Sequence, residues 1–541
     1  MKRSLVGLFL ASLGLFVSVG PTLAETKSTK SHPETKTLAV QELAKLIDRT
    51  VTTQWKANTV KPASIAQDTE FLRRVYLDLT GRIPRVSEVR AFLAEKKPNK
   101  RERIINELLG SGRYVSHFGN TFRDIILPAT SNVRYQAYRP QFEKWLETKL
   151  RSNVGYDKIV RELLSSTGTQ AYQGRGPSPL RTNFGVQAFY FANERKPELV
   201  AATTAKVFLG VRIDCAQCHD HPFAKWERKH FWEFAAFFSS VSRTPVVRLG
   251  QQKIPVPYPG KIKIPKTGTV VEAKFLNGEA PRLDQGSSPQ AVLAEWITSP
   301  KNPYFARNTV NRLWAHLFGI GIVDPVDEEA GEANPPSHPK LLDALADQFV
   351  RHDFDIQYIV KAIMLSETYQ RTSKLSHKSQ EDPRLFARMS VKAMTPEQLF
   401  DSLVQATGYQ AISSGRTRYV LFNRSTPRAR FLADFKRTDY PTTTQTSILQ
   451  ALALMNGKVV SDATSLRTSQ TLTAIVEAPF FTTKDKISTL YLATLSRLPR
   501  ETELKRVEAY VQTGGARRDE KEALGDVFWA LLNTPEFRFN H

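Results

Sequence analysis

The sequence contains few cysteines and, beyond its N-terminus, no long apolar segment. Cys215 and Cys218 are the only cysteines among 541 residues. A chain of this size with two cysteines has no disulfide scaffold, so its stability must come from packed hydrophobic cores. Hydrophobic residues make up 41% of the chain, which is enough to fill such cores. No stretch after residue 24 reaches the roughly 20 apolar residues that a bilayer crossing needs, so we predict no transmembrane segment in the mature chain.

The first 24 residues show the order of features of a secretory signal peptide. Lys2 and Arg3 give it a positive start, residues 5–19 are apolar, and Ala24 is the small residue at the cleavage position. The apolar run is too short for a membrane-spanning helix. We therefore expect cleavage after Ala24 and an exported protein of the periplasm or the cell surface.

Acidic residues are scarce relative to basic ones. The chain has 76 Lys and Arg residues against 53 Asp and Glu residues, which gives a formal net charge of +23. An excess of this size favours association with polyanions. Because export separates the protein from nucleic acid, we expect no nucleic-acid partner. Acidic polysaccharide or another exported protein is the expected partner.

The remaining sequence predicts a mainly α fold with two helical domains and a small β-rich insert between them. Residues 25–37 are mostly Lys, Thr, Ser and Glu, as in a flexible leader. Helical apolar spacing over residues 38–241 predicts an N-terminal domain that includes both cysteines. Alternating apolar residues with prolines at their margins predict short edge strands within 242–287. Residues 288–541 return to helical spacing and form the C-terminal domain.

Several helix ends can also be predicted. Ser288 and Pro289 have the residue types of a helix N-cap and first helical position. Gly319 is suited to end a helix that covers about residues 304–318.

One short pattern occurs twice, near the two ends of the chain. Each copy predicts a helix, an Arg-x-Pro turn and a second helix, with Ser87 or Thr502 placed to cap the second helix. The pair is interpreted either as a reused helical hairpin or as a duplicated binding module. The shared residues are Tyr76, Arg82, Pro84, Arg85 and Glu88 in the first copy and Tyr491, Arg497, Pro499, Arg500 and Glu503 in the second.

Residues 215–219, Cys-Ala-Gln-Cys-His, have the spacing that attaches c-type haem. Two thiols three positions apart can reach the two vinyl groups of one porphyrin, and His219 then supplies the axial imidazole. A zinc site that uses Cys215, Cys218 and one or two of His219, His221 and His230 is an alternative. A disulfide or a free thiol pair without a cofactor is another.

An aromatic segment follows the cysteines and allows two interpretations. Its rings either cover one face of a porphyrin or belong to the hydrophobic core. The residues are Phe231, Trp232, Phe234, Phe237 and Phe238.

A second group of polar residues lies downstream. Arginine, histidine and paired carboxylates are the residue types that acid and base catalysis requires. The alternative is a solvated helix face followed by a polar loop. The residues are Arg312, His316, Asp324, Asp327 and His338.

Residues 71–92, with Tyr76-Leu77-Asp78-Leu79-Thr80-Gly81-Arg82-Ile83-Pro84, together with the run from Cys215 to Phe223, resemble a known family. It is the planctomycete cytochrome-c-associated family of exported proteins, catalogued as domain of unknown function fifteen-forty-nine. Three further segments resemble its usual companion, domain fifteen-fifty-three; they are residues 302–318, 334–339 and 450–456.

This resemblance implies a large exported bacterial protein in which Cys215, Cys218 and His219 belong to the family pattern. The family has no assigned activity and supplies no catalytic residues. Three hypotheses on function follow, and they leave open whether the protein is an enzyme. The first is a haem or metal protein for electron transfer or a redox step, and the second is a non-catalytic envelope scaffold that binds acidic glycan. The third is a hydrolase that uses His316, His338, Asp324 and Asp327.

Overall fold

The chain divides into two units, Met1–Thr37 and Leu38–His541, and the second unit contains the fold. The expected signal peptide at residues 1–24 lies outside the described residues, as does the leader except for Thr37. The computed structural model describes residues 37–128, 130, 132–166, 184–220, 225–241, 260–283, 288–409, 426–434 and 457–541.

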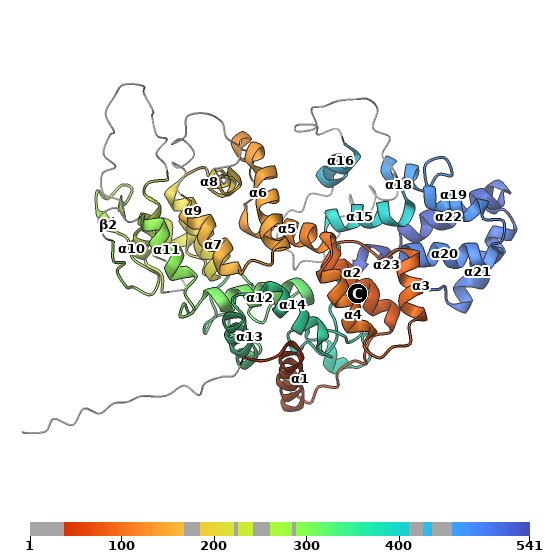
Figure 1. Cartoon of the computed structure of the whole chain (residues 1–541), viewed down its shortest axis with the longest axis horizontal. Helices are drawn as coiled ribbons and strands as arrows, with labels where there is room; N and C mark the ends of the chain where they lie inside the picture. Colours follow the sequence, from red (N-terminus) through yellow and green to blue (C-terminus); the bar gives the residue numbers. More distant parts are fainter. Residues whose placement is uncertain are drawn as a thin grey trace, which may run out of the picture. The chain divides into compact units, whose positions relative to one another are not determined.

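Leu38–His541 is built mainly from helices, as the sequence predicts (Figure 1). Helix α9 (Pro197–Thr204) continues into a π-helical turn, η3 (Ala205–Leu209). Three 3₁₀-helices also lie in the first half of the chain, and they are η2 (Phe184–Val186), η4 (Asp214–Gln217) and η5 (Ala236–Phe238). The α-helices before the first strand are α1 (Val40–Ala57), α2 (Asp68–Thr80), α3 (Val86–Ala94), α4 (Lys100–Leu109), α5 (Gly112–Ile126), α6 (Val133–Arg151), α7 (Tyr156–Ser165), α8 (Gln187–Ala192), α9 (Pro197–Thr204) and α10 (Arg228–Ala235).

The second half is again helical. Short 3₁₀-helices η6 (Lys378–Gln380), η7 (Pro383–Leu385) and η9 (Gly515–Arg517) interrupt it. Its α-helices are α11 (Pro289–Ile297), α12 (Phe305–Phe318), α13 (Pro339–Arg351), α14 (Ile356–Leu365), α15 (Pro396–Thr407), α16 (Pro427–Asp434), α18 (Lys458–Ala463), α19 (Gln470–Glu477), α20 (Thr483–Leu495), α21 (Glu501–Gln512), α22 (Glu520–Leu532) and α23 (Pro535–Arg538). Among the described helices, none is both long enough and apolar enough to cross a membrane.

The described strands form two small antiparallel pairs. Strand β1 (Lys261–Lys263) pairs with β2 (Val270–Glu272), so short strands do occur within the predicted insert. Strand β3 (Lys392–Ala393) pairs with β4 (Phe539–Asn540), which joins residues almost 150 positions apart at the very end of the chain.

The predicted ends of α11 and α12 are confirmed. The Ser288 hydroxyl accepts the backbone N–H of Ala291, and Pro289 is the first residue of α11. Helix α12 ends at Gly319, whose φ of 81° is the left-handed conformation that glycine adopts without strain. Local chemistry alone determines both ends, which is why the sequence was sufficient.

The repeated pattern forms two helical hairpins, α2–α3 and α20–α21. In each, the guanidinium lies over the preceding tyrosine ring, at 5.8 Å for Arg82 and Tyr76 and 5.5 Å for Arg497 and Tyr491. The predicted caps are wrong. Instead of Ser87 or Thr502, the third residue of the second helix accepts the cap N–H, in the bonds from Arg85 N to Glu88 and from Arg500 N to Glu503.

Two hydrophobic cores lie inside the unit, and α2 contributes to both. The first core runs from Leu43 to Met389 along the sequence and also includes Leu492. The second contains Leu77 and Ile83 of the first hairpin together with side chains between residues 394 and 537. The first core draws on both sides of residues 242–287, while the domain boundaries at 241 and 288 stay a prediction.

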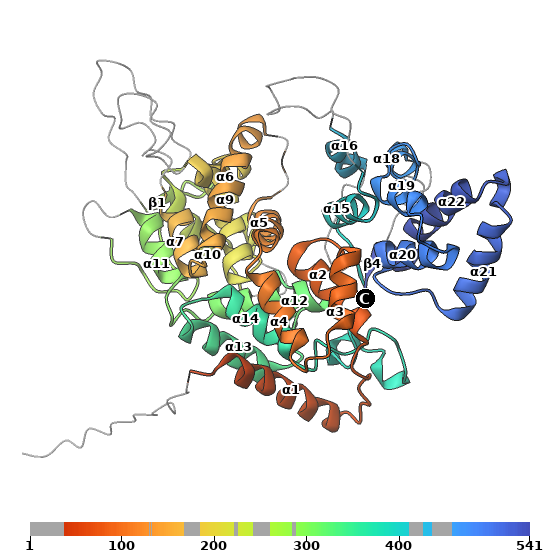
Figure 2. The same cartoon turned by 45° about the vertical axis from the view of Figure 1, so that its right-hand side comes forward.

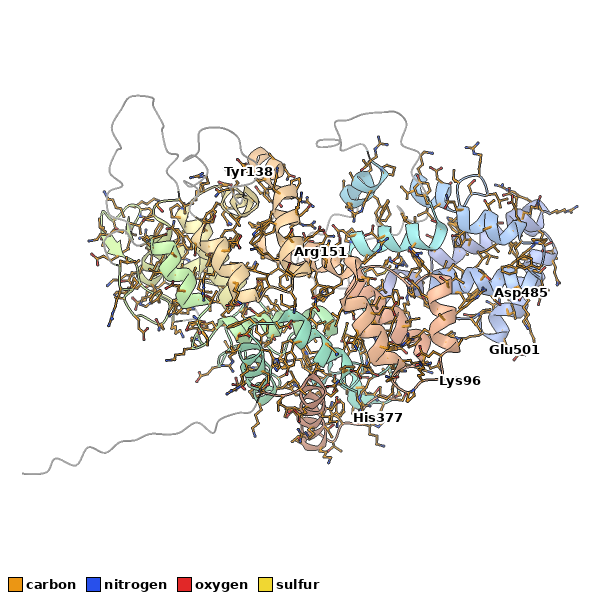
Figure 3. All side chains as sticks on the ribbon, in the orientation of Figure 1. Lys96, Tyr138, Arg151, His377, Asp485 and Glu501 are labelled. Carbon is orange, nitrogen blue, oxygen red and sulfur yellow. The ribbon has the colours of Figure 1, made fainter. Side chains whose placement is uncertain are left out.

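Side chains fill the space between the helices, as Figure 3 shows for the described residues. Tyr138 of α6, labelled there, stacks on Phe191 of α8 with ring centroids 4.8 Å apart. Such stacking adds about 0.5–1.5 kcal/mol beyond the burial of area.

Helix α2 is buried from residue 71 to residue 80 and binds the end of the chain. The guanidinium of Arg73 donates to the carbonyls of Thr494 and Phe537 at 2.8 and 2.9 Å. Arg74 donates to the carbonyl of Tyr369 at 2.7 Å and pairs with Glu70. The C-terminus accordingly lies beside α2 in both views (Figures 1 and 2).

Candidate functional site

The two cysteines lie on a short 3₁₀ turn at the protein surface. Cys215 lies within η4 and Cys218 follows it directly. Side chains three residues apart eclipse one another in a 3₁₀-helix, so the two thiols are presented on one face. Both cysteines are exposed, and neither forms a disulfide. The segment 215–219, called the cysteine segment below, therefore offers two accessible thiols to one partner.

Helix α10 holds the cysteine segment in place. Ile213 and Ala216 are buried. The carbonyl of Gln217 accepts the indole N–H of Trp232 at 3.1 Å and a guanidinium N–H of Arg228 at 3.4 Å. This anchoring fixes the backbone between the two thiols and leaves the sulfur atoms free.

His219 has one ring nitrogen engaged by the backbone. Its Nδ1 lies 2.7 Å from the carbonyl oxygen of Asp220. Because a carbonyl only accepts, Nδ1 must carry the proton, and Nε2 then keeps its lone pair. Histidines that ligate a metal have the same arrangement, with the non-ligating N–H donated to a carbonyl or carboxylate. The imidazole of His219 is exposed, and the lone pair of its Nε2 is available to a ligand.

His230 has the opposite arrangement. Its Nδ1 accepts the backbone N–H of Glu227 at 3.2 Å and so caps α10. In the neutral ring the proton then lies on Nε2, so neither nitrogen has a free lone pair in this conformation. His221, the other additional ligand considered, lies outside the described residues. In the described part of the chain no three His, Cys, Asp or Glu side chains gather closely enough to hold a metal ion.

The aromatic segment after the cysteines belongs to the core. None of its five rings is more than 4% exposed, so these rings do not form a wall over the thiols. Helical spacing looks the same for a core stripe and for a cofactor wall, and the sequence alone left both interpretations open. The rings are those of Phe231, Trp232, Phe234, Phe237 and Phe238.

The downstream polar residues occupy three different surroundings, and the structure joins Arg312 to Asp327. The Nη2 atom of Arg312 lies 2.6 Å from a carboxylate oxygen of Asp327 and 2.7 Å from the carbonyl of Lys206. The ammonium of Lys206 reaches the same carboxylate at 3.2 Å. Asn308 accepts from Arg312 Nε and donates to the carbonyl of Val207. This cluster fastens α12 to the π-helical turn η3.

His316 points from α12 toward α2. Its Nε2 donates to the carbonyl of Asp78 at 3.3 Å, and its ring centroid lies 5.8 Å from that of His117. Burial and the nearby ammonium of Lys392 lower the pKa of His316. Burial, followed by the proximity of His316 and Lys392, lowers the pKa of His117 to about 3.

His338 and Asp324 lie in the polar loop before α13. Burial, together with the charge of Arg384, lowers the pKa of His338 to about 4. Burial raises the pKa of the Asp324 carboxyl. Within the described residues no hydrogen bond or ion pair joins His316 to Asp324, Asp327 or His338. The contacts that these residues make in the described structure are contacts of packing and of helix attachment.

Sequence reasoning missed the buried charges on α2. The Asp78 carboxylate is 1% exposed and accepts from Tyr369 Oη at 2.8 Å, Lys392 Nζ at 2.7 Å and Asn540 Nδ2 at 2.7 Å. Its partners are far away in the sequence, and no short-range pattern points to them. The only local signal is a helix in which charged residues alternate with large apolar ones, and such a helix is usually half exposed.

Two family models match the chain. Residues 46–243 match the model described as a protein of unknown function (DUF1549), and residues 290–511 match a second one, also described as a protein of unknown function (DUF1553). The searches of curated proteins and of solved structures give no match. The cysteine segment and the first hairpin lie in the first region, whereas α12, Lys392 and the second hairpin lie in the second. The chain thus carries the domain pair DUF1549 and DUF1553, in the order that its motifs indicate.

Proposed function

We propose that the cysteine segment is a covalent attachment site for haem c in an exported protein that serves electron transfer or a redox step. Cys215 and Cys218 would form the thioether bonds, and His219 Nε2 would be the axial ligand. The observation that supports this most directly is the hydrogen bond between His219 Nδ1 and the carbonyl of Asp220, 2.7 Å long. It places the proton on Nδ1 and so leaves Nε2 free to ligate.

Among the described residues, the donor set fits haem better than it fits zinc. A structural zinc site needs four ligands around one ion. Within the described residues no three donors converge, and His230 uses its Nδ1 lone pair to cap α10. Haem requires a different set of ligands, because the two sulfurs bond to two separate vinyl groups and only the imidazole reaches the iron. The cysteine segment has these groups, namely two exposed thiols on one face of a turn and one imidazole with a free Nε2 lone pair.

Bound haem would supply one-electron chemistry at its iron. The chain's own residues would position it. The bonds from Trp232 and Arg228 to the Gln217 carbonyl hold the backbone between the thiols, and the Asp220 carbonyl orients the imidazole. Since such attachment takes place outside the cytoplasm, the predicted signal peptide with cleavage after Ala24 supports the same proposal.

Expression of the full chain, signal peptide included, in a bacterial host with a haem-ligation system tests the proposal. We expect a Soret band that survives acid–acetone extraction and is lost in the Cys215→Ser/Cys218→Ser variant. His219→Ala should keep covalent haem but change the spectrum of the axially ligated iron. His230→Ala is the matched control, since His230 caps a helix, and it should leave the spectrum unchanged.

Two results would contradict the proposal. A colourless protein with one zinc per chain would show that the cysteine segment binds zinc instead of haem. A haem spectrum that changes equally in His219→Ala and His230→Ala would contradict the assignment of His219 as the iron ligand.

A further inference from the structure

A groove lined by three arginines lies where the first helical hairpin meets α15 and α19, well apart in the sequence from the cysteine segment. Its volume is about 280 Å³. One wall comes from the DUF1549 region and the other from the DUF1553 region. We call it the arginine groove, and its charged and amide side chains are Arg82, Arg85, Arg113, Asp401, Gln405 and Gln470.

The innermost of these arginines is buried and incompletely bonded. Arg82 is 6% exposed, and its Nε is buried without a hydrogen-bond partner in the described structure. Its Nη1 donates to Gln405 Oε1 at 2.8 Å, and its Nη2 is 3.4 Å from Glu88. Burial, with the charges of Arg113 and Arg85 nearby, lowers the pKa of Arg82, although Glu88 opposes this effect.

The two outer arginines are exposed. Among the described residues, no hydrogen bond or ion pair engages the guanidinium of Arg85 or Arg113. The one carboxylate in the lining, Asp401, is 3.4 Å from Arg428, which faces it from α16. Among the described residues, four guanidinium groups therefore face two carboxylates, those of Asp401 and Glu88, which gives the groove an excess of positive charge.

The second hairpin shows what a compensated copy of the same motif looks like. Arg497, the counterpart of Arg82, is bonded by both oxygens of Glu503 at 2.8 and 2.9 Å and by both oxygens of Glu536 at 2.6 and 2.8 Å. These carboxylates raise the pKa of Arg497. Where Glu536 neutralises Arg497, the neutral amide of Gln405 meets Arg82. The two hairpins share a backbone motif and differ in charge, so the excess charge is a property of the groove and not of the motif.

The groove also presents hydrogen-bond donors. Because Gln405 Oε1 is occupied by Arg82, the NH₂ end of this amide is directed away from that bond. Guanidinium groups match the geometry of oxyanions, to which they donate two bonds at once. Arg85, Arg113 and the Gln405 amide thus form a set of donors around an open, positively charged hollow.

We propose that the arginine groove binds the oxyanion groups of an anionic polysaccharide, with sulfate or carboxylate seated between Arg85 and Arg113. This inference does not rest on the haem proposal. Polysaccharide is the expected source because the predicted signal peptide takes the chain to where acidic glycans are found. The groove is a specific site at which a chain of net charge +23 can bind a polyanion.

Binding of dextran sulfate, carboxymethyl dextran and neutral dextran to the full chain, measured by titration calorimetry at two salt concentrations, tests the proposal. We expect binding of one or both charged dextrans, weakened by salt, and no binding of neutral dextran. The charged dextran that binds identifies sulfate or carboxylate as the preferred group. Arg85→Gln/Arg113→Gln should weaken binding by about 10- to 100-fold, since two charge-assisted contacts are lost.

The matched control is Arg500→Gln/Arg506→Gln, which removes the same charge from exposed positions of the second hairpin. It should change the affinity by less than about threefold, because it leaves the groove intact. Arg82 is left unchanged in both variants since it also binds the Ile83 carbonyl inside the fold. Thermal unfolding and circular dichroism should be the same for the two double variants.

Equal weakening in both double variants would overturn the proposal, because the attraction would then be a property of overall charge. Binding of a single-stranded DNA oligonucleotide more tightly than either charged dextran, with loss in Arg85→Gln/Arg113→Gln, would overturn the choice of polysaccharide. Absence of binding to any charged dextran at low salt would overturn both the groove as a binding site and polysaccharide as its ligand.

Discussion

Replacement of Asp78 by alanine is expected to destabilise the protein severely. The Asp78 carboxylate is 1% exposed and is the meeting point of three distant segments, through Tyr369, Lys392 and Asn540. Its removal leaves the ammonium of Lys392, whose side chain is 16% exposed, with the carbonyls of His316 and Leu317 as its remaining partners among the described residues. A buried cation without a counter-ion is the costly outcome.

The magnitude follows from the burial of the pair. Removing one partner of a buried ion pair costs about 3–5 kcal/mol, because the remaining charge stays desolvated. The lost acceptor for Tyr369 and Asn540 adds to this cost, since each unsatisfied donor is worth about 1–3 kcal/mol. We therefore expect Asp78→Ala to lower the free energy of unfolding by at least about 3 kcal/mol, as measured by urea denaturation followed by circular dichroism.

A double variant separates the ion pair from the other bonds of Asp78. Asp78→Asn/Lys392→Met keeps an amide for Tyr369 and Asn540 and removes both charges. The double variant should be more stable, by about 2 kcal/mol of coupling, than the summed losses of the single variants Asp78→Asn and Lys392→Met predict. If Asp78→Ala costs less than about 1 kcal/mol, or if the cycle shows no coupling, the pair does not hold these segments together.

Three further predictions concern the same region and its neighbours. Because burial lowers the pKa of His117 to about 3 from an unfolded value of 6.5, the unfolded state binds more protons below pH 6.5. Stability should thus fall as the pH decreases from 6.5 toward 4, and His117→Phe should reduce the slope by up to about 1.4 kcal/mol per pH unit. Gly81→Ala should destabilise the protein by more than about 1 kcal/mol, because the φ of Gly81 is 68° and the added Cβ would lie 2.5 Å from His117 Nδ1. Gly112→Ala is the neutral control in thermal unfolding, since a Cβ at Gly112 would have no atom within 4 Å. Asp327→Ala, which leaves Arg312 without its carboxylate, should cost about 3 kcal/mol in urea unfolding while haem loading stays unchanged; a loss of loading with the fold intact would mean that this cluster serves the cysteine segment.

The sequence predicts the local features of this fold well. Helical apolar spacing, the cap at Ser288, the glycine end of α12 and the strands within 242–287 depend on neighbouring residues, and all are found as expected. The two hairpins were likewise visible as a repeated pattern. Their caps were predicted incorrectly because each second helix begins one residue before the hydroxyl residue, so Arg85 and Arg500 occupy the N-cap positions.

The sequence did not predict which distant residues meet in the folded chain. Lys392 meets Asp78 across 314 positions, and Gln405 meets Arg82 across 323 positions, so no periodicity connects them. The aromatic residues of α10 illustrate a second limit, since spacing that predicts a buried face does not tell whether core or cofactor covers it. The role proposed for the cysteine segment rests on its own residue types, whereas the tautomer of His219 required the structure.

The haem proposal requires that Cys215 and Cys218 both bond to one porphyrin. Intact mass spectrometry of the purified mature chain, produced in a host with a haem-ligation system, tests it most directly. We expect the polypeptide mass plus one haem, with the added mass located on the peptide that contains both cysteines and absent from Cys215→Ser/Cys218→Ser. A mass equal to that of the polypeptide alone would contradict it.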